Sequence, residues 1–156
     1  MEANSTTTGM LTAAEIQLIY KSNVRASQRP VANSSRRAYE VLLASWDEGT
    51  IEYIEQFKIL LLNTAKRVLG VYEVSSGGTD FTPVDPKLIF TAALKCNACG
   101  IILAHCHPSG TLRPSDADVL LTKRLMAGGE LLGTYIIDHL IITTEGYYSF
   151  RDEGLL

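Results

Sequence analysis

A short apolar run that ends in two closely spaced histidines constrains the fold of this chain more than any other feature. The run GIILA occupies residues 100–104, and His105 and His107 follow it directly, before the sequence PSG. An apolar run of this length predicts a strand buried on both faces of a sheet, so other elements must cover both sides of that sheet. The two histidines then lie where a buried strand leaves the core.

The patterns on either side of this run predict a mixed set of strands and helices. Apolar residues alternate with polar ones in the strand segments and recur at helical spacing in the others. The strands are expected at 15–21, in a hairpin over 55–79 that turns at 63–66, at 100–105, and in a final pair, 134–143 and 146–150. The helices are expected within 33–49, 85–98 and 115–130, the last with Leu120, Leu121 and Leu125 inward and closed by Gly128 and Gly129. This order predicts an α/β or α+β sandwich, a mixed β-sheet flanked by helices.

Length and charge limit the organisation and the partners of the chain. Its 156 residues, 46% of them hydrophobic, predict one globular domain over residues 13–156, preceded by a flexible tail over residues 1–12. The net charge of −3 does not favour autonomous binding to nucleic acid, which needs a surplus of clustered Lys and Arg. Three cysteines without an apolar leader predict a cytoplasmic protein, and no apolar run approaches the roughly 18 residues that would cross a membrane.

His105 and His107 can converge on one ion. Side chains alternate along an extended chain, so the two imidazoles point to the same side, about 6.6 Å apart along the strand. Beyond the turn, Ser115 is placed to cap the next helix, with Asp118 in its first turn. Ser115 and Asp118 alone form a capping box that needs no metal. Two histidines and one aspartate together can also bind zinc and leave the fourth position to water.

Hydrolysis at such a site requires a general base beside the water. Zinc lowers the pKa of its water to about 7, and a carboxylate is the usual proton acceptor. Spacing alone does not choose among the carboxylates that lie near predicted strand ends: Glu52, Glu55, Glu73, Asp80, Asp138 and Glu145.

The spacing of the histidines, serine and aspartate resembles a known signature. His105-x-His107-Pro108, followed by Ser115-x-x-Asp118, is similar to the JAMM (MPN+) zinc metallopeptidase motif, and HPSG…PS..D resembles the RadC family in particular. Further segments resemble RadC segments and follow in the same order, so that the resemblance covers roughly residues 15–156: EQFKILLLN, SSGGT, DPKLIFTAALKCNACGIILAH, LLGTYIIDHLII and GYYSF.

The resemblance implies a JAMM-type three-layer sandwich in which His105, His107 and Asp118 hold a Zn²⁺ ion. It implies Glu55 as the general base and Ser115 as a hydrogen-bond donor to the developing oxyanion, so the expected reaction is hydrolysis of a peptide or isopeptide bond. The family carries a DNA repair label. The alternative is a non-catalytic, metal-binding interaction module with protein partners in DNA metabolism.

Several further residues have open roles. Cys106 stands where RadC proteins usually carry Asn, and as the middle residue of an extended triplet it should point away from the metal and pack in the core. Packing is also expected for Cys96 and Cys99, whose CxxC spacing has no second pair. His139 is expected to support a ligand or the structure rather than bind the metal, and Glu73 is the second candidate for the base.

Overall fold

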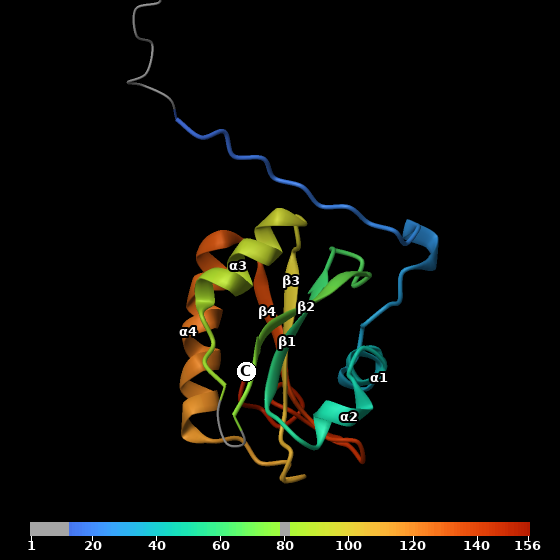
Figure 1. Ribbon diagram of the computed structural model, residues 1–156, viewed down its shortest axis with the longest axis vertical. Helices are drawn as coiled ribbons and strands as arrows, with labels where there is room; N and C mark the ends of the chain where they lie inside the picture. The colour runs from blue at the N-terminus through green and yellow to red at the C-terminus, as the bar shows by residue number, and fades with distance from the viewer. Residues whose placement is uncertain (1–12, 79–81) are drawn as a thin grey trace, which may run out of the picture.

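One mixed β-sheet of five strands, in the order β2-β1-β3-β4-β5, forms the centre of the molecule (Figure 1). This computed structural model describes residues 13–78 and 82–156; the expected tail at residues 1–12 and the candidate base Asp80 lie outside the described residues. The strands are β1 (Gln56–Leu62), β2 (Val68–Ser76), β3 (Gly100–Cys106), β4 (Tyr135–Ile142) and β5 (Tyr147–Ser149). β3 and β4 are parallel, and the other neighbouring pairs are antiparallel.

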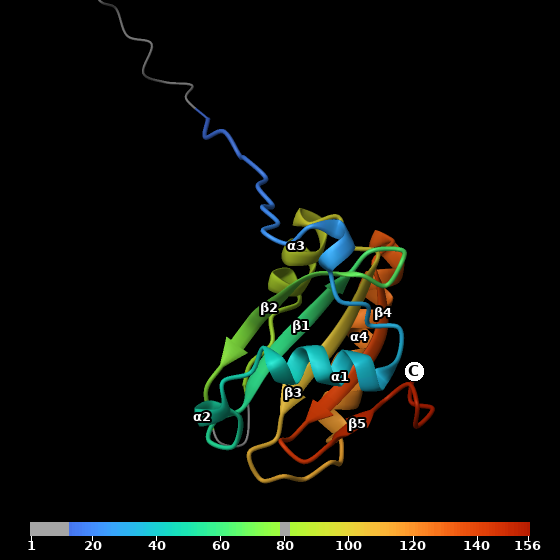
Figure 2. The same ribbon diagram turned by 90° about the vertical axis from the view of Figure 1, so that its right-hand side faces the viewer.

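Helices cover both faces of this sheet, as the buried run predicts. The helices are η1 (Ala26–Gln28), α1 (Ser35–Ala44), α2 (Glu48–Ile51), α3 (Pro86–Lys95) and α4 (Asp116–Leu132). α1 and α2 lie on one face and α3 and α4 on the other, which gives three layers (Figure 1, Figure 2). In the described part of the chain, no helix has the length and apolar character that crossing a membrane requires.

Successive residues of β3 divide between the two cores of the molecule. Ile102 and Ala104 pack in the core on the α1 side, whereas Ile101 and Leu103 pack in the core that includes residues of α3 and α4. This division is the physical reason why β3 is apolar at every position before its histidine. The predicted α+β sandwich is therefore confirmed.

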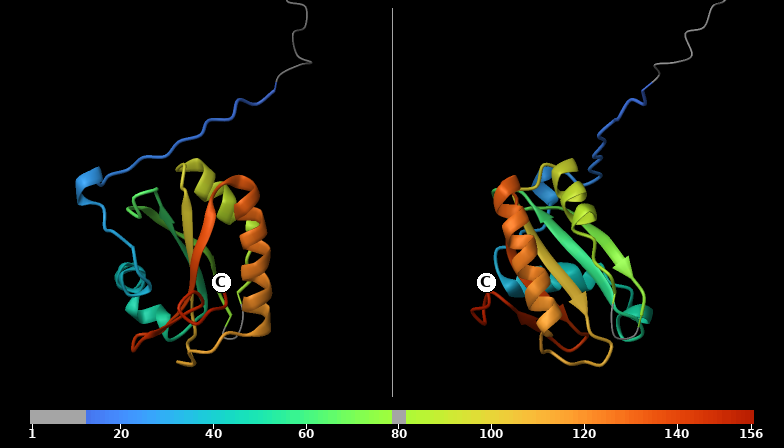
Figure 3. Two further views of the ribbon diagram at one scale, coloured as in Figure 1. Left: turned by 180° about the vertical axis from the view of Figure 1, so that it is seen from behind. Right: turned by 90° about the vertical axis from the view of Figure 1, so that its left-hand side faces the viewer.

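Strand pairing brings three distant segments to one end of the sheet. Phe57 at the start of β1 pairs with His105 at the end of β3, because these two strands are antiparallel. β3 and β4 are parallel, so α4, which connects them in the sequence, has to run back along the sheet. Its first turn therefore lies at the end of the sheet where β3 ends (Figure 3). The residues before β1, after β3 and at the start of α4 meet there.

The expected strand at residues 15–21 is wrong. This segment has no regular secondary structure, and its Ile16 and Leu18 side chains are 84% and 77% exposed. It runs away from the sheet (Figure 1), and Tyr20 donates a hydrogen bond to the Leu69 carbonyl at 2.5 Å. Alternation determines which side chains share a face, but a strand also needs a partner strand, and none pairs with this segment among the described residues.

The helix after the histidine turn is longer than expected. α4 passes through Gly128 and Gly129 and ends before Gly133, which adopts a left-handed φ of 66°. Gly129 is required for packing rather than for ending the helix, because a Cβ there would lie 2.5 Å from the Thr134 carbonyl oxygen. Leu120, expected to face inward, is exposed.

Candidate metal centre

Four side chains from three segments meet at this end of the sheet. His105 is almost fully buried at the end of β3, His107 lies in the turn that follows, Glu55 directly precedes β1, and Asp118 lies in the first turn of α4. All four line one cleft of about 460 Å³, together with Ser115 at the N-cap of α4. The structure thus brings the three predicted ligands together with the predicted base.

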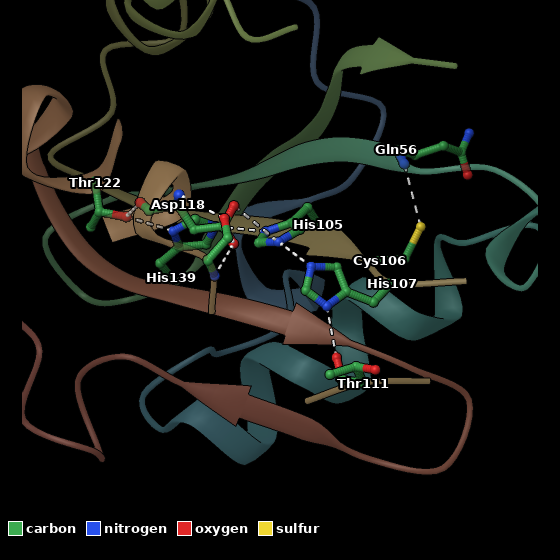
Figure 4. Close-up of polar contacts among 9 residues, drawn as sticks. Gln56, His105, Cys106, His107, Thr111, Asp118, Thr122 and His139 are labelled. Atoms are coloured by element: carbon green, nitrogen blue, oxygen red, sulfur yellow. Dashed lines mark hydrogen bonds and ion pairs between the residues drawn. The ribbon is translucent and has the colours of Figure 1, made fainter. Parts of the chain in front are cut away.

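The ring nitrogens of the two histidines point toward each other (Figure 4). His105 Nε2 and His107 Nε2 lie 3.0 Å apart, and His105 Nε2 lies 3.4 Å from Asp118 Oδ1. Two ligand atoms that each lie about 2.0–2.1 Å from a tetrahedral ion are about 3.3 Å from each other. These separations are therefore close to those between ligands of a single ion.

Glu55 belongs to the same cluster. One carboxylate oxygen of Glu55 and one ring nitrogen each of His105 and His107 all lie within 4.8 Å of one another, a grouping that could hold a metal ion. Asp118 joins the cluster through its contact with His105. The geometry therefore allows two ligand sets, the two histidines with Asp118, as predicted, or the two histidines with Glu55.

The start of α4 holds Asp118 in place. Ser115 Oγ accepts a hydrogen bond from the Asp118 amide at 3.1 Å, and the Ser115 amide and hydroxyl both donate to Asp118 Oδ2 at 2.7 Å, which completes the predicted capping box. Burial by itself would raise the pKa of Asp118, but the contacts with His105 and Ser115 outweigh burial and hold that pKa below its ordinary value. The Ser115 hydroxyl proton is directed at Asp118, and the role of Ser115 as an oxyanion donor stays a prediction.

A backbone carbonyl sets the proton position on His107. His107 Nδ1 lies 2.7 Å from the Thr111 carbonyl oxygen, which can only accept a hydrogen bond. The proton of the neutral ring is therefore on Nδ1, and Nε2 carries a lone pair that faces His105. A ring nitrogen in this state can bind a metal ion without first losing a proton.

His139 supports His105 from the interior. Its Nε2 lies 2.9 Å from His105 Nδ1, and its Nδ1 lies 2.7 Å from Thr122 Oγ1. Burial, reinforced by the neighbouring His105, holds the pKa of His139 well below its ordinary value, so the ring is neutral. Thr122 was not singled out by the sequence analysis. The one signal that could have found it is its position four residues after Asp118, on the same face of a predicted helix.

Cys106 points to the opposite side of the sheet, as predicted (Figure 4). Its sulfur accepts a hydrogen bond from the Gln56 amide at 3.4 Å and donates to the Ile54 carbonyl at 3.3 Å. Burial raises the pKa of this thiol. Cys106 is therefore a packed, neutral core residue in this structure and does not occupy the cleft.

The other candidate bases lie elsewhere. Of the candidates among the described residues, only Glu55 lines the cleft with the histidines. Glu73, the second choice, accepts a hydrogen bond from Gln56 Nε2 at 3.1 Å and lies 4.0 Å from Lys58 Nζ. Asp138 is fully buried in a separate network of hydrogen bonds.

Comparisons with known proteins agree with this architecture. The family model of the RadC-like JAB domain matches residues 32–155. A UPF0758 protein of Flavobacterium johnsoniae is 48% identical over 101 residues, which are 65% of this chain and 44% of the relative. A UPF0758 protein of Thermotoga maritima is 41% identical over 106 residues, 67% of this chain and 48% of the relative. A UPF0758 protein of Desulfitobacterium hafniense is 35% identical over 130 residues, 82% of this chain and 55% of the relative.

These matches cover about half the length of each relative, so they describe a domain and not the whole of those proteins. The family model spans all five strands of the sheet and all four α-helices, from before α1 to beyond β5. The end of β3 with its two histidines and the start of α4 with Asp118 both lie within the matched region. This chain belongs to the RadC-like JAB domain family.

Proposed function

We propose that this domain is a zinc-dependent hydrolase that cleaves a peptide or isopeptide bond, with the zinc ion held by His105, His107 and Asp118. The observation that carries the proposal is the 3.0 Å separation of the two Nε2 atoms, combined with a His107 proton that is committed to Thr111. A lone pair that faces a second ring nitrogen this closely is stabilised by a cation beside both. A zinc ion is suited to bind two imidazoles and a carboxylate at once.

The hydrogen bonds around Asp118 favour it over Glu55 as the third ligand. Two donors from Ser115 hold Asp118 Oδ2, and this fixes Oδ1 opposite His105. A ligand carboxylate oriented in this way by its own hydrogen bonds is typical of metal sites. Glu55 is then left at the edge of the cluster, where a general base is needed.

The chemistry assigned to the side chains follows from these positions. A bound zinc ion would polarise the substrate carbonyl and bring the pKa of its water to about 7. Glu55 takes a proton from the attacking water and passes it to the leaving amine. Ser115 turns its hydroxyl from Asp118 Oδ2 to the developing oxyanion, while its backbone amide keeps its hydrogen bond to Oδ2 and so keeps Asp118 in place.

The cleft supports a polypeptide as the substrate. Phe57, Val84 and Leu121 provide an apolar wall beside the polar cluster, which suits a side chain next to the bond to be cut. All three cysteines are free thiols, which supports a reducing compartment such as the cytoplasm. Protein partners in DNA metabolism stay a prediction from the resemblance.

The zinc content of the purified protein and of two variants tests the ligand set. We expect about one zinc per chain in the wild type and in Glu55→Gln, and little zinc in Asp118→Asn. The reverse pattern, with zinc lost in Glu55→Gln and kept in Asp118→Asn, would show that Glu55 is the third ligand.

Hydrolysis is tested on panels of fluorogenic peptides and isopeptide-linked peptides. We expect wild-type, zinc-loaded protein to cleave a member of these panels and Glu55→Gln to lose that activity while keeping its zinc. Unchanged activity in Glu55→Gln would remove Glu55 as the base. Stoichiometric zinc without cleavage of any panel member would favour the interaction module.

A further inference from the structure

Three short hydrogen bonds connect Asp118 to His105 through the protein interior (Figure 4). The Asp118 carbonyl oxygen lies 2.6 Å from Thr122 Oγ1, which in turn lies 2.7 Å from His139 Nδ1. The other ring nitrogen of His139 lies 2.9 Å from His105 Nδ1. Thr122 and His139 are 2% and 0% exposed, so bulk water does not compete for these groups.

The carbonyl oxygen at one end determines where each proton in this series lies. Two oxygens 2.6 Å apart need a proton between them, and a carbonyl has none to give, so the Thr122 hydroxyl donates to Asp118. Thr122 Oγ1 then accepts the Nδ1 proton of His139. His139 is fully buried between the rings of Phe57 and Phe150, which favours the uncharged ring, and with its one proton on Nδ1 its Nε2 accepts the Nδ1 proton of His105. His105 Nε2 is left with a lone pair that faces the cluster.

We propose that Thr122 and His139 are positioning residues that fix the tautomer of His105, so that His105 Nε2 presents a lone pair to the metal. This inference rests on the proposed zinc site. The outer nitrogen of a ligand histidine usually donates to a carboxylate, a backbone carbonyl or water. Here His105 Nδ1 donates to a second imidazole, that of His139. The proton position of His139 is in turn set, through Thr122, by a backbone carbonyl of α4. Because that backbone belongs to Asp118, one predicted ligand sets the proton position of another.

Packing keeps His139 in the orientation that this role requires. Its ring stacks on Phe150 with centroids 4.5 Å apart, and Phe57 meets it edge-on at 5.7 Å. In the opposite tautomer, His105 would carry its proton on Nε2. Metal binding would then first require that proton to be moved or removed.

Nuclear magnetic resonance of the metal-free protein measures these tautomers directly. The chain has only three histidines, so long-range ¹H–¹⁵N spectra at about pH 8 contain few ring signals. We expect His105 and His139 each to carry a proton on Nδ1 and none on Nε2, and His107 to carry a proton on Nδ1, although free histidine favours Nε2. A proton on Nε2 of His105 would overturn the inference.

Two substitutions at Thr122 test the effect on metal binding. Thr122→Val keeps the shape of the side chain but removes the hydroxyl, and Thr122→Ser is the matched control that keeps it. We expect zinc affinity, measured by competition with a chromophoric chelator, to fall about 10- to 100-fold in Thr122→Val and to stay within about threefold of wild type in Thr122→Ser. The His105 proton should move to Nε2 in Thr122→Val alone.

The two measurements separate this inference from the proposed function. Equal zinc affinities in Thr122→Val, Thr122→Ser and wild type would overturn the positioning role while the zinc site stands. A wild type that binds no zinc, although its histidines carry their protons as expected, would instead defeat the proposed function and with it the role of Thr122 and His139 in metal binding. Failure of Thr122→Val to fold would leave the wild-type spectra to decide.

Discussion

Two polar clusters contain adjacent residues of β4, Asp138 and His139, but they differ in how their polar groups are paired. Asp138 accepts hydrogen bonds from the His139 amide at 2.7 Å, the Arg151 amide at 3.0 Å and the Ser149 hydroxyl at 2.6 Å. That carboxylate is fully buried and is satisfied by the protein alone. The cluster around His105 and His107 instead places two ring nitrogens 3.0 Å apart beside a carboxylate. A closed network serves stability, whereas an open one indicates a binding site.

The two clusters face opposite sides of the sheet because neighbouring residues of a strand alternate. Asp138 ties β4 to the turn after β5, while His139 contacts β3 and α4. The dipeptide Asp138-His139 therefore serves two purposes that can be separated by substitution. We expect changes at Asp138 to affect folding and changes around His105 to affect metal binding.

The largest expected effect on folding is that of Asp138→Ala. This change leaves the Ser149 hydroxyl and two backbone amides without their acceptor, and each unsatisfied buried group costs about 1–3 kcal/mol. We expect the free energy of unfolding, measured with urea, to fall by about 3 kcal/mol or more. Zinc affinity should change by less than about tenfold, and a larger loss would show that the two clusters are not separable.

His107→Ala should give the opposite result. Removing one of the three proposed ligands is expected to lower zinc affinity at least about 100-fold. Because His107 is only half-buried and bonds to an exposed carbonyl, the unfolding free energy of the metal-free protein should change by no more than about 0.5 kcal/mol. Titration calorimetry and urea unfolding measure the two quantities, and a stability loss like that of Asp138→Ala would contradict the comparison.

The pH dependence of stability should have opposite signs for the two aspartates. The pKa of Asp118 lies below its ordinary value of 3.8, so its contribution to stability is present above pH 3.8 and is lost as pH falls further. Burial raises the pKa of Asp138 despite its three hydrogen bonds, so the protein loses stability as pH rises from 3.8 through that higher pKa.

Urea unfolding of metal-free wild type, Asp118→Asn and Asp138→Asn between about pH 3 and 6 resolves these signs. The stability advantage of wild type over Asp118→Asn should shrink below pH 3.8. Relative to Asp138→Asn, wild type should lose stability as pH rises above 3.8. Equal slopes for both variants would remove the distinction between the two carboxylates.

The smallest expected effect is that of Cys106→Ala. Cys106 is buried next to His105 and His107 in sequence but faces the α1 side, so we expect a stability loss of about 1 kcal/mol and unchanged zinc affinity. Cys96→Ala, which removes a half-buried thiol at the end of α3, is the matched control and should change stability by less. A change in zinc affinity for Cys106→Ala would place the thiol in the site.

Local features of this chain could be predicted because each depends on neighbours in the sequence. The apolar run before His105 predicts a strand between two covered faces, and the structure has one. The two-residue period predicts that Cys106 faces away from His105 and His107, and it does. The spacing of Ser115 and Asp118 predicts a capping box, which forms at the start of α4.

What the sequence by itself determined is thus the strands and main helices from residue 33 onward, the side of the sheet on which His105 and His107 lie, and the turn that returns Asp118 to them. Tertiary structure alone decided that residues 15–21 find no partner strand among the described residues, that α4 continues through Gly129, and that His139 joins Thr122 to His105. The physical reason is that hydrogen bonds between distant segments depend on strand pairing and helix position. Neither is contained in the local period of a sequence.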